Sequence, residues 1–227
     1  KCEKIFCYSK KIINFPRKYN YKMYLVHPIL KKKIYEIKED KNNDIDKNLN
    51  LLILGGSQGA LFFDNFIKDL VIKLPKTKKF KLYQQVSNRE KIPELKNIYD
   101  NLKIENDLFS FESNIQNKMS KCNFAITRCG ATTLAELVHF NIPFIGIPFP
   151  FAKDDHQYHN ALYYSEKNCC WLYNQNNISL DNILNLFNQI LQDSSVYKEK
   201  YQDIKKISYK SNWNNVNKKL VDLFNEY

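Results

Sequence analysis

Residues 51–60 read Leu51-Leu52-Ile53-Leu54-Gly55-Gly56-Ser57-Gln58-Gly59-Ala60, which has the form of a buried strand, a glycine turn and the start of a helix. Residues 127–136 read Thr127-Arg128-Cys129-Gly130-Ala131-Thr132-Thr133-Leu134-Ala135-Glu136 and repeat that form. Glycine at such a turn lets the backbone approach a ligand closely, and the free N–H groups at the start of a helix attract anions. Because such turns gather at the carboxyl ends of parallel strands, we expect one anionic ligand to contact both.

Strands and helices alternate outward from these two stretches. The pattern of apolar residues and turn residues predicts strands at 5–9, 23–26, 50–54, 80–84, 102–105, 123–127, 143–147 and 170–173. Helices are expected at 28–37, 60–73, 89–99, 114–121, 132–140, 155–167, 179–192, 195–208 and 212–226. Strands separated by helices of this length indicate an α/β fold, a Rossmann-like parallel sheet with helices on both faces.

The segment 39–48 is polar and mixed in charge, which predicts a linker, so a new domain is expected to start near Asn48. The chain starts at Lys1, at what the pattern indicates is the middle of a structure, and we expect it to be a fragment of a longer protein.

The composition is that of a globular protein with a strong positive charge. The 227 residues are 44% hydrophobic, and the formal net charge of +11 would suit an anionic partner. Lysine is scattered along the whole chain, however, and only Lys31-Lys32-Lys33 forms a compact run. A general compositional bias is therefore favoured over a nucleic-acid surface, which needs basic and aromatic residues clustered on one element.

The cysteines and the hydropathy indicate the cellular environment. None of the six cysteines forms a C-x-x-C pair, so we expect no metal site, and buried free thiols in a reducing compartment are the favoured interpretation. Cys122, Cys169 and Cys170 each start an apolar run. No apolar stretch reaches the length of a membrane span and no signal peptide opens the chain, which predicts a cytosolic or membrane-peripheral protein.

Each glycine stretch by itself leaves alternatives open. The first departs from both the Walker pattern and the dinucleotide fingerprint, so an ordinary tight turn competes with an anion site, which the hydroxyl of Ser57 favours. In the second, Glu136 can close a capping box with Thr132 or Thr133. Alternatively, Glu136 accepts hydrogen bonds from vicinal hydroxyls such as those of a ribose.

A third segment, residues 147–161, carries prolines that end a buried strand and lead into a helix. Gln157 and Asn160 lie on one face of this helix, and their amides suit the hydroxyls of a sugar. His156 and His159 can bind a metal or transfer protons, but two histidines without a third ligand are more often ordinary polar residues. The pair Asp154-Asp155 is most simply a signal for the start of the helix.

The three segments GGSQGA, TRCGATTLAEL and IPFPFAKDDHQYHNA, in this order and spacing, resemble the carboxyl-terminal half of the MurG family of glycosyltransferases. The resemblance runs from the segment 21–33 to the tail. It implies a GT-B fold of two Rossmann-like domains, of which residues 48–210 would be the domain that binds UDP-N-acetylglucosamine. Residues 1–47 would be a remnant of the amino-terminal acceptor domain with the interdomain linker, and 211–227 a carboxyl-terminal helix.

The resemblance also implies a set of substrate-binding residues. Ser57, within the Gly56 turn, would contact the diphosphate, and Glu136 would hold the ribose hydroxyls. Gln157 and Asn160 would read the sugar, and the uracil would lie at the helix start that follows Phe111. The full set is Gly56, Ser57, Gln58, Phe111, Glu112, Ile115, Gly130, Ala131, Thr132, Thr133, Leu134, Ala135, Glu136, Gln157 and Asn160.

The chain also departs from the family pattern. The family carries an arginine before the linker where this chain has Leu30, unless the Lys31–Lys33 run replaces it. Glu112 stands where an apolar residue is usual, and Cys129 where serine is common. Catalytic residues are expected in the amino-terminal domain, which this chain largely lacks, so the chain is expected to bind donor without turning it over.

The implied reaction is inverting transfer of N-acetylglucosamine from UDP-N-acetylglucosamine to the undecaprenyl-diphosphate-linked muramyl-pentapeptide, a step of peptidoglycan synthesis that serves cell-wall biogenesis, cell shape and cell division. It implies no cofactor or metal, because helix dipoles can stabilise the departing UDP. The expected partners are the donor, the lipid-linked acceptor and an anionic membrane surface, with no nucleic acid. The expected location is the cytoplasmic face of the inner membrane. The alternatives are another GT-B nucleotide-sugar transferase and a non-catalytic UDP-sugar-binding subunit that needs a partner chain.

Overall fold

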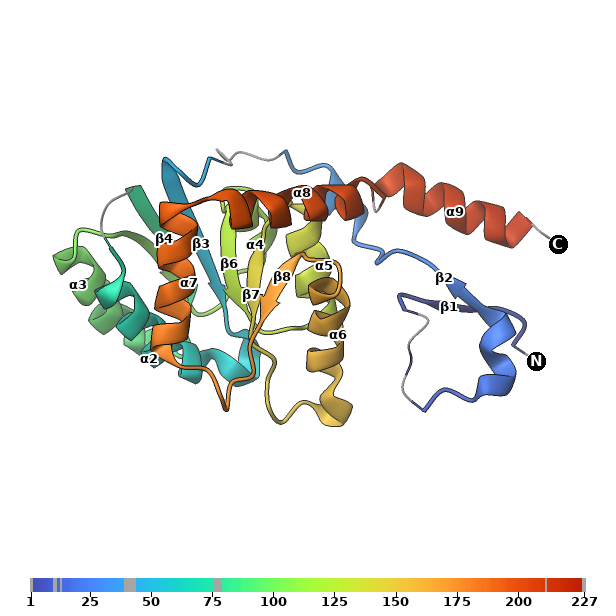
Figure 1. Ribbon diagram of the computed structural model, residues 1–227, viewed down its shortest axis with the longest axis horizontal. Coiled ribbons are helices and arrows are strands. Elements are labelled where there is room, and N and C mark those ends of the chain that lie inside the picture. The colour runs from blue at the N-terminus through green and yellow to red at the C-terminus, as the bar shows by residue number, and fades with distance from the viewer. Residues whose placement is uncertain are drawn as a thin grey trace.

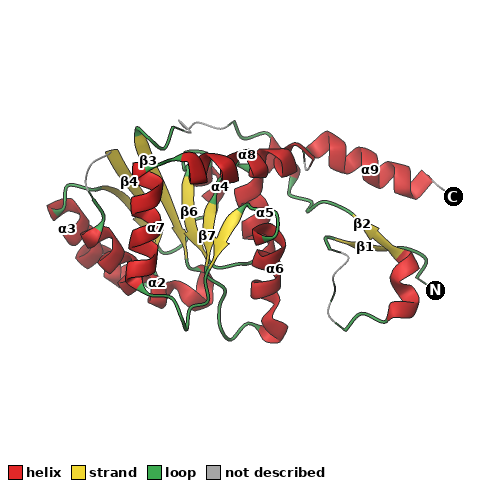
Figure 2. Ribbon diagram, viewed as in Figure 1, coloured by secondary structure: helices red, strands yellow, loops and turns green. Residues whose placement is uncertain are grey.

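The computed structural model describes residues 2–9, 12, 14–38, 44–75, 79–210 and 212–225 (Figure 1), with only the backbone at 57–60, 209 and 210. Within these residues the main body is a sheet of parallel strands between two layers of helices (Figure 2). The order of the strands across the sheet is β5-β4-β3-β6-β7-β8. Their bounds are β3 (Asn48–Leu54), β4 (Lys79–Gln85), β5 (Glu105–Phe109), β6 (Phe124–Thr127), β7 (Phe144–Gly146) and β8 (Cys170–Leu172).

Alternation along the central strand explains why helices cover both faces. Leu51 and Ile53 of β3 belong to one core cluster, while Leu52 and Leu54 belong to the other, as the two-residue period of a strand requires. The first cluster includes side chains of α2 (Gly56–Lys73), α3 (Ile92–Asn101) and α7 (Leu180–Gln192). The second includes side chains of α4 (Ile115–Met119), α5 (Ala131–His139) and α6 (His156–Ser165). Helix α8 (Ser195–Lys210) contributes Tyr197 to the first cluster and Ile204 to the second.

The strand order contains one reversal. The chain proceeds from β3 outward through β4 to β5, then returns to the other side of β3 and continues through β6, β7 and β8. In a doubly wound sheet, the loops that leave the carboxyl ends of the two strands at such a reversal diverge and open a crevice. The two glycine stretches follow β3 and β6, so both lie at this point.

Residues before the main sheet form a separate small unit, here called the N-terminal unit. It consists of β1 (Ile5–Cys7), a short 3-10 helix η1 (Arg17–Lys22) and β2 (Met23–Leu25), with β1 and β2 paired in parallel. The short helix α1 (Lys32–Tyr35) lies between this unit and β3. The last helix, α9 (Trp213–Asn225), returns to the unit (Figure 1), where Lys4 Nζ donates to the carbonyl of Leu223 and the rings of Phe6 and Phe224 lie 5.6 Å apart.

The predicted α/β fold class is confirmed, and most elements lie within a few residues of their expected bounds. The strand predicted at 102–105 is wrong, because α3 continues to Asn101 and Lys103 then turns with φ of 57°, so that β5 begins only at Glu105. Helix α2 begins at Gly56, four residues earlier than predicted. Half of the expected linker, residues 39–43, lies outside the described residues, as does the end of the last predicted helix at residue 226.

The cysteine and membrane expectations can also be compared with the structure. Cys122, Cys169 and Cys170 are buried free thiols, as expected, and burial raises the pKa of Cys169 and of Cys170 to about 12. Among the described residues, no helix is both long and apolar enough to cross a bilayer. In the same part of the chain, no group of three or more His, Cys, Asp or Glu side chains is arranged to hold a metal ion.

Candidate functional site

The turn after β3 is built around Gly56, whose backbone conformation favours glycine. Gly56 has φ of +61°, in the left-handed region that other residues adopt at a cost. A Cβ at this position would meet no atom within 4 Å, so it is the backbone conformation, and not a lack of space, that favours glycine here. The N–H of Gly56 donates to Oε1 of Gln85, the last residue of β4, at 3.1 Å. The N–H of Gly56 is therefore occupied, and the backbone N–H groups that could bind an anion at the start of α2 are those of the residues after Gly56.

The turn after β6 leaves its helix N-terminus open. Gly130 is the N-cap of α5, and among the described residues no side chain forms a capping bond there. Its carbonyl accepts the first helical bond from Leu134 at 3.0 Å. The N–H groups of the first turn have no partner within the helix, and these donors coincide with the positive end of the helix dipole.

Glu136 is a buried carboxylate held by another side chain. Gln116 Nε2 donates to its Oε1 at 2.9 Å, and only 6% of the residue is exposed. Burial raises the pKa of Glu136, while the bond from Gln116 and the positive charge of Lys31 oppose that rise. The capping-box alternative is wrong, because the start of α5 has no side-chain cap and Glu136 bonds to α4 instead.

The raised pKa predicts a pH-dependent stability. Folding favours the protonated form of Glu136, so the stabilisation from this group is complete below its ordinary pKa of about 4 and is lost as pH rises through the raised value. Glu136→Gln removes the titration and keeps a partner for Gln116. We expect the difference in melting temperature, variant minus wild type, to increase as pH rises from about 4 to 7. A difference that stays constant with pH would contradict this expectation.

Arg128 is a buried cation below the two turns. Its Nη1 donates to the carbonyls of Ile147 and Pro148, both at 3.0 Å, and its Nη2 donates to Gln175 Oε1. Its Nε has no hydrogen-bond partner in the described part of the chain, and none of the ion pairs found there includes Arg128. Burial lowers the pKa of Arg128 to about 10, so the guanidinium keeps its charge at neutral pH. An unpaired buried charge of this kind suits an anionic ligand.

Three aromatic rings surround the guanidinium of Arg128. Its central carbon lies 5.4 Å, 5.0 Å and 5.5 Å from the ring centres of Phe62, Phe63 and Phe149. These rings stabilise the cation through their π-electrons and keep water away. The planar guanidinium can stack and donate in several directions at once, which a lysine cannot do.

Gln157 and Asn160 hold the peptide groups of Cys129 between them. Gln157 Oε1 accepts from the N–H of Cys129 at 3.1 Å and from the N–H of Phe149 at 3.0 Å. Asn160 Nδ2 donates to the carbonyl of Cys129 at 3.0 Å. Both amides thus fix the turn that leads into α5, and among the described residues no hydrogen bond involves the NH₂ of Gln157 or the oxygen of Asn160.

The segment before α6 is strained and lacks the expected cap. Asp154 and Asp155 both have positive φ, 52° and 50°, which is a costly conformation for residues other than glycine. Helix α6 begins directly after this pair, with Asp155 at the N-cap position, so the predicted helix start is confirmed, but the side chain of Asp155 forms no capping bond. Nδ1 of His156 lies 2.8 Å from the carbonyl of Lys153, which links the start of α6 to the short 3-10 helix η3 (Lys153–Asp155).

The loop after β5 closes the other end of the site. Phe111 is 81% exposed, while Ile115 at the start of α4 is half-buried. Glu112 Oε1 accepts from the N–H of Asn114 at 3.0 Å, and its other oxygen lies 3.7 Å from Lys118 Nζ. The carboxylate of Glu112 is therefore engaged by its own loop and by Lys118 of α4.

These parts enclose a cavity of about 310 Å³ at the reversal of the strand order. The last residues of four strands line it, namely Leu54, Gln85, Phe109 and Thr127. The predicted site residues that also line it are Gly56, Phe111, Glu112, Ile115, Gly130, Thr133, Glu136 and Gln157. Half of the residues that line this cavity are therefore among those that the sequence indicated.

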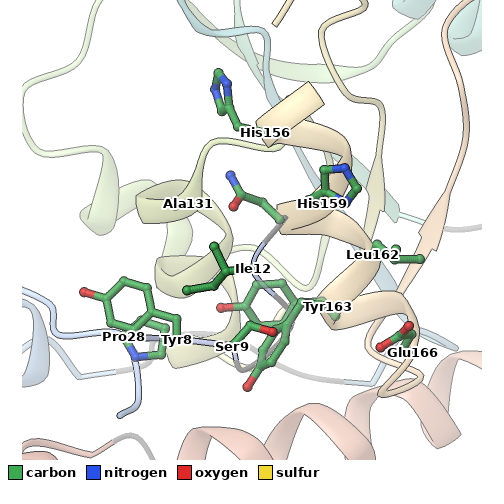
Figure 3. Close-up of a pocket in the computed structure, with 12 residues that line it drawn as sticks. Tyr8, Ser9, Ile12, Pro28, Ala131, His156, His159, Leu162, Tyr163 and Glu166 are labelled. Atoms are coloured by element: carbon green, nitrogen blue, oxygen red, sulfur yellow. The ribbon is translucent and has the colours of Figure 1, made fainter. Parts of the chain in front are cut away.

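A larger cavity of about 610 Å³ adjoins the other side of the α5 helix start. Figure 3 shows Tyr8, Ser9 and Ile12 of the N-terminal segment on one side and His159 and Tyr163 of α6 on another. The predicted residues Ala131 and Asn160 line this cavity and not the smaller one. Gly130 lines one cavity and Ala131 the other, so consecutive residues at that helix start line both cavities.

Some predicted residues do not reach either cavity. Leu134 and Ala135 are buried, 0% and 7% exposed, and belong to the core below α5. Thr132 is exposed and lines neither space. The side chains of Ser57 and Gln58 lie outside the described residues.

Sequence reasoning missed three residues with specific contacts at the site: Gln85, Gln116 and Arg128. Gln85 directly follows a predicted strand, at the edge of the sheet where ligands bind, and that position could have identified it. Arg128 stood within the second quoted stretch, in a chain whose basic residues are otherwise nearly all lysine. Gln116 offered no signal, because its partner Glu136 lies twenty residues away.

The doubly wound sheet and the cavity at its reversal define a Rossmann-like domain of the kind that binds nucleotides. The chain belongs to glycosyltransferase family 28: residues 50–214 match the Glycosyltransferase family 28 C-terminal domain. This match confirms the prediction that the sheet domain is the carboxyl-terminal domain of a GT-B glycosyltransferase.

Individual relatives agree with this family. The chain is 41% identical over 99% of its length to the UDP-N-acetylglucosamine--N-acetylmuramyl-(pentapeptide) pyrophosphoryl-undecaprenol N-acetylglucosamine transferase of Pelagibacter ubique (strain HTCC1062), of which it covers 62%. It is 29% identical over 83% of its length to the enzyme of the same name from Wolbachia sp. subsp. Drosophila simulans (strain wRi), of which it covers 55%. The crystal structure of Acinetobacter baumannii MurG shares the fold, with a TM-score of 0.65, 19% identity and coverage of 91% of this chain and 57% of that one. The chain thus spans less than two thirds of these proteins.

Proposed function

We propose that this chain is the donor-binding part of an inverting glycosyltransferase that moves N-acetylglucosamine from UDP-N-acetylglucosamine to an undecaprenyl-diphosphate-linked muramyl-pentapeptide, the step from lipid I to lipid II in peptidoglycan synthesis. The observation that carries the donor assignment is the 310 Å³ cavity, because it brings both helix starts, a buried cation and a buried carboxylate together. The choice of this particular reaction is supported by the 41% identity to a relative of that name.

The nucleotide fits this cavity in one direction. The uracil would lie against Phe111 and Ile115 and bond to the backbone of Glu112, and the ribose hydroxyls would donate to Glu136. The diphosphate would lie between the starts of α2 and α5, above the charge of Arg128. As the bond between the sugar and UDP breaks, the leaving phosphate oxygen gains negative charge, which the helix N–H groups and the guanidinium stabilise. This arrangement uses no metal.

The sugar would extend from the diphosphate toward the larger cavity. The NH₂ of Gln157 and the oxygen of Asn160, which have no partner among the described residues, are then available to its hydroxyl and acetamido groups. Because Gln157 also holds Cys129 and Phe149, replacing it would disturb the nucleotide turn as well as the sugar contact. A comparison of donors on the intact chain is therefore a cleaner test of sugar choice than a Gln157 variant.

The cation that family members carry before the linker has a substitute in this proposal. Leu30 stands at that position and is buried against the core. Its neighbour Lys31 is exposed, and its positive charge acts on the carboxyl of Glu136. Lys31 would therefore supply the positive charge on the ribose side of the nucleotide, where Leu30 cannot.

The remaining parts of the reaction are assigned to the rest of the protein. The acceptor hydroxyl attacks the anomeric carbon and transfers its proton to a base, which we place in the amino-terminal domain. Residues 1–47 would belong to that domain and its linker, residues 48–210 to the donor domain, and residues 211–227 to a terminal helix. The lipid-linked acceptor implies that the protein works at the cytoplasmic face of the inner membrane, where the net charge of +11 would favour anionic lipids.

Calorimetry on the 227-residue chain tests the donor assignment. UDP-N-acetylglucosamine is expected to bind about tenfold more tightly than UDP-glucose, because one additional hydrogen bond to the acetamido group contributes about 1 kcal/mol or slightly more. UDP alone should bind, and ADP-glucose should bind more weakly than UDP-glucose. Equal affinities for all nucleotide sugars, or no binding of UDP, would contradict the proposal.

A further inference from the structure

The side chain of Gln85 joins two loops that lie far apart in the sequence. Its Oε1 accepts from the N–H of Gly56 at 3.1 Å, and its Nε2 lies 3.5 Å from the carbonyl oxygen of Ser110. Gly56 begins the phosphate-facing helix α2, and Ser110 immediately precedes the loop that closes the other end of the cavity. Gln85 itself lines the cavity.

The backbone that carries Gln85 is fixed independently. It is the last residue of β4 and pairs with Phe109 of β5. Two residues later, the N–H of Ser87 donates to Oδ1 of the buried Asp64 in α2 at 3.2 Å. The end of β4 is thus bound to helix α2 through Asp64 as well as through Gln85, and the Gln85 amide projects from a rigid base.

We propose that Gln85 is a positioning residue for the nucleotide, one that holds the start of α2 and the loop after β5 at a fixed separation. This inference rests on the proposed function, because the two loops it joins are those assigned to the diphosphate and to the base. UDP spans both loops, whereas uridine without phosphates reaches only one. The contribution of Gln85 therefore appears only when a ligand engages both ends of the cavity.

Gln85→Met tests this role, because methionine has a similar length but neither accepts from Gly56 nor donates to Ser110. We expect UDP affinity to fall roughly tenfold, the equivalent of about one hydrogen bond to a well-placed group, and uridine affinity to change less than about twofold. Amide hydrogen exchange at Gly56, measured without ligand, should accelerate. Calorimetry and exchange are both performed on the 227-residue chain.

Gln84→Met is the matched control. Gln84 precedes Gln85 on the same strand but faces the other side of the sheet, where its Oε1 accepts from Tyr99 at 2.8 Å. This variant should leave UDP affinity and Gly56 exchange unchanged, whatever its effect on the melting temperature. A Gln85→Met chain that binds UDP as the wild type does, or that loses UDP and uridine affinity equally, would overturn the inference.

Different results would contradict the proposed function and the role of Gln85. If the wild-type chain binds no UDP, the proposed function is wrong and Gln85 has no nucleotide to position. If the wild type binds UDP but Gly56 exchange is unaltered in Gln85→Met, the contact does not fix the turn, and only the Gln85 inference is overturned.

Discussion

Arg128→Met is expected to lower the affinity of the chain for UDP roughly 100-fold, which corresponds to about 2.7 kcal/mol. The guanidinium is buried, lines the cavity and has no acidic partner among the described residues. Removing it would leave the diphosphate without the nearest buried positive charge, and the loss of a charged partner in a desolvated site costs about 2–5 kcal/mol. Calorimetry with UDP and with uridine would measure the effect.

The comparison of ligands separates binding from folding for this variant. Arg128 also bonds to the carbonyls of Ile147 and Pro148, so Arg128→Met should melt at a lower temperature. Uridine lacks the diphosphate and should lose little affinity. Arg128→Lys keeps the charge but cannot donate in all three directions. Its affinity for UDP should therefore lie between that of the wild type and that of Arg128→Met. If uridine and UDP weakened equally, the arginine would have only a structural role.

Phe124→Ala is expected to cost about 3–5 kcal/mol of unfolding free energy, the usual range for a large buried aromatic side chain. Phe124 is fully buried at the start of β6, with its ring centre 5.6 Å from that of Trp171 and 5.3 Å from that of Phe187. The cavity left behind would lie below the centre of the sheet. Thermal and urea unfolding would show a melting temperature lower by about 10 °C.

Phe224→Ala provides the same chemical change at an exposed position. Phe224 is 65% exposed on the last helix and contacts Phe6, so its removal should cost about 0.5 kcal/mol or less. Similar losses for the two variants would contradict the description of Phe124 as part of the central core.

The fold was predictable because its signals are local. Apolar runs such as residues 51–54 are followed by glycine and then by helical periodicity, and this repetition is sufficient to identify a parallel α/β sheet. Element boundaries were harder to predict. Nothing in residues 102–105 distinguishes the turn at Lys103 from a strand, because the left-handed conformation is taken there by a lysine, a residue without a strong preference for it.

The site was predictable to the extent that its residues lie within motifs. The two glycine turns and Glu136 followed from the order of strand, turn and helix. The side chains that hold the first turn and Glu136 could not be predicted in this way. The pairs Gly56 with Gln85 and Glu136 with Gln116 depend on which elements become neighbours in the fold. The capping interpretation of Glu136 failed for the same reason: a local partner was available in the sequence, but a distant one takes its place in the fold.

The return of α9 to the N-terminal unit has a mechanical consequence. The chain crosses between the unit and the sheet domain twice, once between β2 and β3 and again between α8 and α9. The unit is therefore joined to the sheet domain at two points of the chain, and a displacement of the unit would change the width of the 610 Å³ cavity, which Tyr8 lines from the unit and His159 lines from the sheet domain. The same displacement would leave the 310 Å³ cavity intact, because all of its lining residues belong to the sheet domain. The shape of the smaller cavity is therefore independent of where the unit lies.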